Sequence, residues 1–216
     1  MTRKRRNWER SVLLVITNLF LASIYLAACG VYPEHRPRGE VKRTDNMTMN
    51  QERRDLNERV TKNPGSFQQH VPEGYQLTAA VDVNQESETA RIIYEIMLDE
   101  VNLPMANVIQ SFTLHPDMIH VFHAAELPHS NVINTYETTL EPGKVPKGLS
   151  LAKGYVLKAR EELESQYLRN YTDMYVKISY GPNDQRTEQY VHLQAKPSAR
   201  MIEYMKSLDK KEKQEK

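Results

Sequence analysis

Four of the seven histidines lie in one short stretch of the chain. They are His115, His120, His123 and His129, and Asp117 and Glu126 lie among them. Imidazoles and carboxylates are ligands of zinc and copper, so this stretch is a candidate site for a metal or a small solute. If Met118 to Ala124 forms a strand, however, successive side chains alternate between its faces, and His120 and His123 point opposite ways. We therefore expect core or interface histidines and no cofactor, with a zinc or copper site as the alternative.

Tyrosine is the second residue type whose placement could matter. The chain has 12 tyrosines against four phenylalanines and one tryptophan, and they concentrate in the C-terminal third. A tyrosine joins a large apolar ring to a polar tip, which suits a contact surface. We expect partner binding at Tyr171, Tyr175, Tyr180 and Tyr190. The alternative is that these rings line the wet rim of a small core, because strands are themselves enriched in tyrosine.

Enzyme signatures are missing from the chain. It has no G-x-S-x-G, H-E-x-x-H, Walker or G-x-G-x-x-G motif. Adjacent acidic pairs, such as Asp99 with Glu100, would diverge on a helix or strand and indicate solvated surface. We therefore predict no catalytic residues and expect that the protein is not an enzyme.

The N-terminal residues carry the most specific motif. A basic start is followed by an apolar stretch from Ser11 to Tyr25, and then by Leu26-Ala27-Ala28-Cys29. A basic region, an apolar region and small residues before a cleavage point are typical of a secretory signal. The alternative is an uncleaved anchor helix. It would need about 20 predominantly apolar residues, whereas Val12 to Ala28 is shorter and contains Asn18.

This motif resembles the lipobox of bacterial lipoproteins. The resemblance implies that residues 1–28 are a signal peptide, cut by signal peptidase II between Ala28 and Cys29. It also implies that a diacylglycerol, of the kind that carries palmitate, is attached to the thiol of Cys29. The mature chain would then be anchored by lipid in the cell membrane, on its extracytoplasmic face. Cys29 is the only cysteine, so an internal disulfide is excluded.

The charge balance limits the class of partner. The leader holds five of the 29 basic residues and one of the 28 acidic residues, which leaves 24 basic and 27 acidic residues beyond it. A net charge of −3 gives no reason to expect nucleic acid binding, which needs a clustered basic face. We therefore predict a membrane-anchored module that binds another envelope protein or a wall component.

Composition divides the mature chain into three parts. We expect a lipidated cysteine and flexible stalk over residues 29–71, since this stretch is rich in Pro and Gly and poor in apolar residues. Within it, Asp45 to Val60 could form a short solvated helix. A single α+β domain is predicted over residues 72–209, followed by a charged tail over residues 210–216.

Period-two alternation of apolar residues predicts a mainly antiparallel β domain, a meander or sandwich of about five strands. The five strands are expected at Tyr75–Val83, Ala90–Asp99, Val108–Leu114, Met118–Ala124 and Val132–Leu140. A helix from Ser150 to Arg169 is predicted next, because apolar residues recur there at helical spacing. A β-hairpin of Met174–Tyr180 with Gln189–Ala195 and a C-terminal helix capped by Ser198 complete the expected fold.

Overall fold

The computed structural model describes residues 46–86, 89–134, 138–159, 162–163, 165–182 and 184–212. The predicted signal peptide and Cys29 lie outside these residues. The described part contains helices α2 (Asn46–Lys62) and α3 (Ala199–Glu212), and neither is long and apolar enough to cross a membrane. Its strands are β1 (Gln76–Glu86), β2 (Thr89–Asp99), β3 (Met105–Leu114), β4 (His129–Ser130), β5 (Thr138–Leu140), β6 (Leu149–Val156), β7 (Asp173–Tyr180), β8 (Thr187–Gln194) and β9 (Lys196–Pro197).

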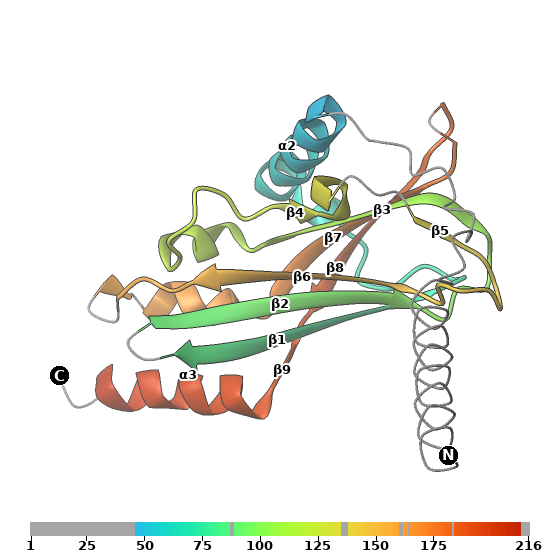
Figure 1. The fold of residues 1–216 in the computed structure, drawn as a ribbon. Coiled ribbons are helices and arrows are strands. Elements are labelled where there is room, and N and C mark those ends of the chain that lie inside the picture. The colour runs from blue at the N-terminus through green and yellow to red at the C-terminus, as the bar shows by residue number, and fades with distance from the viewer. Residues whose placement is uncertain are drawn as a thin grey trace, which may run out of the picture. The chain divides into compact units, whose positions relative to one another are not determined.

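The strands form two mostly antiparallel sheets (Figure 1). The first sheet has the order β6-β2-β1-β9, and its centre is a long hairpin in which Gln76 pairs with Asp99 and Glu86 with Thr89. Only β9 runs parallel to its neighbour, β1. The second sheet has the order β4-β3-β7-β8, with β5 also paired to β3. The prediction of an α+β fold dominated by antiparallel strands is confirmed.

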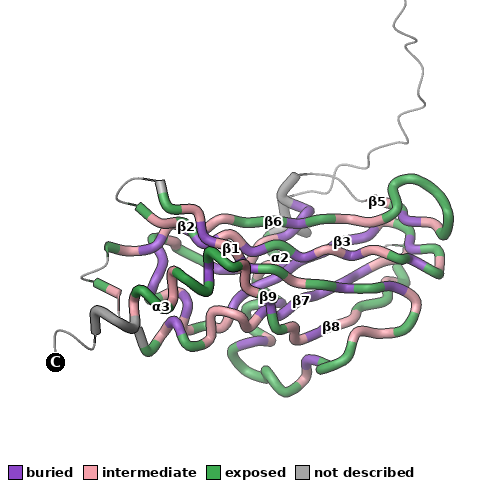
Figure 2. Tube along the Cα trace, turned by 90° about the horizontal axis from the view of Figure 1, so that it is seen from below, coloured by how far each residue is buried: buried purple, intermediate pink, exposed green. Residues whose placement is uncertain are grey.

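The main hydrophobic core draws side chains from both sheets. Ile92, Tyr94, Ile96 and Leu98 of β2 are fully buried in the same cluster as Phe112 of β3. Along β2, buried positions alternate with less buried ones (Figure 2). Full burial of a large apolar side chain contributes roughly 1.5–3 kcal/mol. The alternation read from the sequence therefore correctly assigns the inner face of β1 and β2.

A second apolar cluster lies on the opposite face of β7 and β8. Leu56 and Val60 of α2 are buried there together with Phe67 and Tyr175, and Tyr190 packs against them. The ring of Phe67 meets Tyr175 and Tyr190 edge-on, at centroid distances of 5.0 and 5.7 Å. Helix α2 is thus part of the folded domain.

The predicted flexible stalk over residues 29–71 is therefore wrong for its described part. Asn46–Lys62 is a helix with a buried face, and Gln68 after it bridges to Val191 of β8. The Gln68 amide donates to the Tyr190 carbonyl at 2.9 Å, and the Gln68 carbonyl accepts from the His192 amide at 2.9 Å. The apolar stripe of α2 is thin, but the sheet supplies enough apolar surface to bury it.

The predicted helix from Ser150 to Arg169 is also wrong. Residues Leu149–Val156 form β6, which pairs with β2 along its whole length, and Ser165–Asn170 forms a 3₁₀ helix. The apolar residues do recur at helical spacing. However, the edge of β2 that β1 leaves open presents backbone groups that need hydrogen-bond partners, and β6 pairs with eight of its residues. Pairing in the sheet overrides local helix propensity here.

Two of the five predicted strands are shorter or absent. The expected strand Met118–Ala124 is absent. Its first residues belong to the 3₁₀ helix Pro116–His120, which has Pro116 in its first turn. Of the expected strand Val132–Leu140, residues 132–134 lie in another 3₁₀ helix, Asn131–Asn134, and Thr138–Leu140 forms β5. Proline fixes φ and lacks an N–H, so Pro116 favours a turn of helix over a ladder.

The C-terminal helix begins as predicted. The hydroxyl oxygen of Ser198 accepts a hydrogen bond from the Met201 amide at 3.1 Å, which makes Ser198 the N-cap of α3. Met201 is fully buried against the main core, and Met205 and Leu208 pack there too. Ile202 on the same helix is exposed.

A substitution of Leu56 tests whether α2 belongs to the domain. Leu56→Ala should lower the free energy of unfolding by about 3 kcal/mol, because it removes a fully buried side chain and leaves a cavity. Urea denaturation followed by circular dichroism measures this loss. The control Asn57→Ala changes the exposed neighbour and should cost less than about 0.5 kcal/mol. Equal stability of the two variants would show that α2 is a detached stalk.

Candidate functional site

The buried side chain of Lys177 is the centre of the candidate site. In β7, Val176 and Ile178 point into the main core, so Lys177 between them points to the face covered by α2. Its side chain is 1% exposed, and lysine is almost never buried without a partner. The ammonium nitrogen lies 2.9 Å from Oε1 of Glu52 on α2 and 2.8 Å from Oε1 of Glu188 on β8. This network links three elements through one charge.

The three charges shift one another's pKa values. Burial disfavours the ammonium of Lys177, but the charges and hydrogen bonds of Glu52 and Glu188 outweigh it and raise the pKa of Lys177. Burial also raises the pKa of Glu52 despite its contact with Lys177. At Glu188 burial is outweighed by the hydrogen bond from Lys177, and the pKa is lowered. Glu52 is therefore the acid that protonates first, and its Oε2 has no hydrogen-bond partner within the described structure.

Above this network lies a shallow depression between α2 and β8. Its volume is about 420 Å³, and it is lined by Asp55, Glu58, Arg59, Lys62, Asn63, Glu188 and Tyr190. The guanidinium carbon of Arg59 sits 3.8 Å from the centroid of the Tyr190 ring. The Tyr190 hydroxyl donates to Oε2 of Glu188 at 2.9 Å. The position of Tyr190 is thus fixed by Arg59 over its ring and by Glu188 at its hydroxyl group.

The four tyrosines predicted to bind a partner do not share one surface. Tyr175 and Tyr190 both contact Phe67 beneath α2, but Tyr175 is buried and only Tyr190 lines the depression. Tyr171 and Tyr180 pack against the main core instead. The structure therefore brings one predicted tyrosine to a concave, partly exposed position, and the rest serve packing.

The four histidines of the alternative metal site have separate surroundings. Nδ1 of His115 accepts from the amide of Asp117 at 3.3 Å, and the ring of His120 lies 4.7 Å from that of Tyr167. His123 is exposed, whereas the ring of His129 meets Phe112 edge-on at 5.8 Å. Burial is the main cause that lowers the pKa of His129 to about 4. In the part of the chain that the structure describes, no three His, Cys, Asp or Glu residues are grouped to hold a metal ion.

An aspartate–histidine pair on β7 and β8 was missed by the sequence analysis. Nε2 of His192 lies 2.7 Å from Oδ1 of Asp173, and its Nδ1 lies 3.3 Å from the side-chain nitrogen Nε2 of Gln69. The imidazole also stacks on Tyr175 at 4.6 Å, with the two planes 9° apart. Both ring nitrogens are occupied, so His192 fastens the segment after α2 to the sheet.

The Lys177 network also escaped sequence analysis, for a physical reason. Alternation along Met174–Tyr180 assigns Lys177 to the face opposite the core, which for an isolated hairpin is wet. The neighbour at that face, α2, is more than one hundred residues away in sequence. In the sequence, Lys177 shares a strand face with Tyr175, two residues before it. This spacing alone is too weak a signal to identify the partners of the lysine.

Loss of the Lys177 charge should be costly. Lys177→Met should lower the free energy of unfolding at pH 7 by about 3–5 kcal/mol, because it leaves two acids without their cation. Each acid raises the other's pKa in the absence of the ammonium, so protonation should make the deficit smaller at pH 5 than at pH 7. Chemical denaturation at both pH values measures this.

The control for that measurement is Lys62→Met. It breaks the exposed ion pair of Lys62 with Glu58 on the same helix and should cost less than about 1 kcal/mol at either pH. If Lys177→Met behaved like this control, the buried network would not hold α2 to the sheet.

Similarity to known proteins adds no family to this description. Comparisons with protein-family models, with curated proteins and with solved structures found no match.

Proposed function

We propose that the chain is a lipoprotein, anchored through Cys29 at the extracytoplasmic face of the cell membrane, that binds another protein of the envelope. The anchor is supported by the sequence Leu26-Ala27-Ala28-Cys29 after a basic and apolar leader. Binding, and not catalysis, is supported by the missing enzyme motifs and by the character of the depression between α2 and β8.

The arrangement of Tyr190 carries the proposal. Tyrosine and arginine are, with tryptophan, the residue types enriched among those that dominate binding energy at protein interfaces. Here Arg59 lies on the ring of Tyr190, and Glu188 fixes its hydroxyl. Lys177 in turn fixes Glu188 from below. Side chains that are already ordered lose little rotamer entropy on binding, so the depression is preorganised for contact.

The charges around the depression favour a protein over a uniformly charged wall polymer. Asp55, Glu58 and Glu188 supply negative charge, and Arg59 and Lys62 supply positive charge, within one lining. Because like charges placed opposite one another are unfavourable, a polymer of one sign would meet repulsion at part of this surface. A protein surface of mixed sign can match both.

The anchor is tested by Cys29→Ser. The variant should retain its leader and take up no lipid, since the thiol is the atom that is acylated. Metabolic labelling with a fatty-acid analogue should mark the wild-type chain alone. Labelling of both chains to the same extent would contradict the lipobox assignment.

The binding surface is tested by photocrosslinking in intact cells. A photoreactive residue in place of Lys62, in the depression, should give a discrete crosslinked protein. The same residue in place of Lys206, which is exposed on α3, should not give that product. Asp55→Lys should reduce the yield at position 62 at least about fivefold without changing the melting temperature, because Asp55 is an exposed member of the lining.

The matched control for the charge reversal is Glu203→Lys on α3, which is equally exposed and lies outside the lining. It should leave the crosslinking yield unchanged. An identical product from positions 62 and 206, or equal effects of the two charge reversals, would overturn the assignment of the surface.

A further inference from the structure

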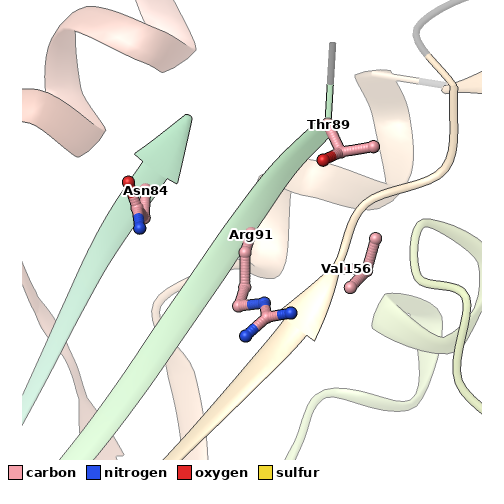
Figure 3. Close-up of a pocket in the computed structure, with 4 residues that line it drawn as sticks. All are labelled: Asn84, Thr89, Arg91 and Val156. Carbon is pink, nitrogen blue, oxygen red and sulfur yellow. The ribbon is translucent and has the colours of Figure 1, made fainter. Parts of the chain in front are cut away.

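A second polar pocket lies on the other sheet, at the end where β1 and β2 meet. It has a volume of about 90 Å³ and is lined by Asn84, Thr89, Arg91 and Val156 (Figure 3). Three of these residues form one row across the sheet, since Asn84 pairs with Arg91 and Arg91 pairs with Val156. Their neighbours Val83, Ile92 and Tyr155 are buried in the core, so the row lies on the outer face.

Gly154 makes room for the side chain of Arg91. A Cβ atom at this position would lie 2.7 Å from Cδ of Arg91 and 3.2 Å from its Cγ, closer than ordinary contact allows. The arginine stem therefore runs flat over β6 where a side chain would otherwise stand. Arg91 is exposed, and in Figure 3 its guanidinium lies between Asn84 and Val156, beside the strands. The glycine thus fixes where the charge is held.

The chemistry of the lining suits an oxyanion. The described lining has one cation and no acid, together with an amide and a hydroxyl that can donate hydrogen bonds. A guanidinium presents a planar fork that binds two oxygens of one phosphate or carboxylate at once. Asn84 and Thr89 flank this fork, where the third oxygen of a tetrahedral phosphate, absent from a carboxylate, would lie.

We propose that Arg91, with Asn84 and Thr89 beside it, binds a phosphate group on the outer face of the β6-β2-β1 sheet. This site is separate from the depression between α2 and β8, with which it shares no lining residue, and it does not depend on the function proposed for that depression. The volume admits one phosphate group and little more, so the group is bound either as free phosphate or as the phosphodiester of a larger molecule.

Nuclear magnetic resonance titration of the full chain in a non-ionic detergent tests this. Inorganic phosphate, added at constant ionic strength against chloride, should shift amide signals of Asn84, Thr89 and Arg91 in a saturable way. Arg91→Gln should weaken binding at least about tenfold, as expected for the loss of a charge-assisted pair of hydrogen bonds. The matched control Arg54→Gln, at an exposed position on α2, should leave the affinity within about twofold.

A second variant tests the geometry and not the charge. Gly154→Ala keeps Arg91 but places a methyl group where its stem lies. It should weaken phosphate binding several-fold and leave the melting temperature nearly unchanged, because the end of a flexible side chain can move away. Unchanged affinity in this variant would overturn the role of Gly154 and the site built on it.

Further arms identify the bound group. Dimethyl phosphate represents a phosphodiester; tighter binding of this probe than of inorganic phosphate assigns the site to a larger molecule, and the reverse assigns it to free phosphate. Acetate should bind at least about tenfold more weakly than either. Equal binding of acetate, or equal effects of Arg91→Gln and Arg54→Gln, would overturn the proposal. Glu86→Gln removes the acid two residues after Asn84. A tenfold gain in phosphate affinity in this variant would also overturn the proposal, because it would show that Arg91 is the counter-ion of Glu86.

Discussion

The buried charge of Lys177 is the constraint on which the rest of the second sheet depends. An ammonium taken out of water costs several kcal/mol unless acids and hydrogen bonds replace its hydration. Glu52 and Glu188 supply these contacts, and they come from α2 and β8 on either side of β7. The helix must therefore lie where Glu52 reaches the ammonium. The apolar contacts of Leu56 and Val60 then complete a position that the charge has specified.

The same interaction reaches the surface. Glu188 holds Lys177 with one carboxylate oxygen and the Tyr190 hydroxyl with the other. Arg59, from the helix that Lys177 fastens, covers the Tyr190 ring. The rigidity of the depression thus comes from a buried ion network, and stability and contact chemistry are coupled through one residue. Substitutions beneath this surface alter its shape as well as the stability of the domain.

The two sheets expose very different surfaces. Beneath α2 the second sheet carries a network in which two glutamates share one lysine. The outer face of the first sheet carries Arg91 in a lining whose described residues include no acid. A glycine on the neighbouring strand, not an ion pair, positions this cation. These opposite solutions lead to different chemistry: the first gives a mixed-sign surface suited to a protein, and the second gives a fork suited to a single oxyanion.

The sequence by itself determined the leader motif, the β-dominated fold class, the inward residues of β1 and β2 and the cap of α3. Each of these depends on residues close together in the chain, so local periodicity and capping chemistry are sufficient. Tertiary structure alone decided that residues 149–156 pair with β2 as a strand, that α2 packs on the sheet, and that one tyrosine, Tyr190, lines the depression. These outcomes depend on partners distant in sequence. Whether a lone lysine is buried in an ion network, or a weak apolar stripe packs on a sheet, depends on the surface that covers it.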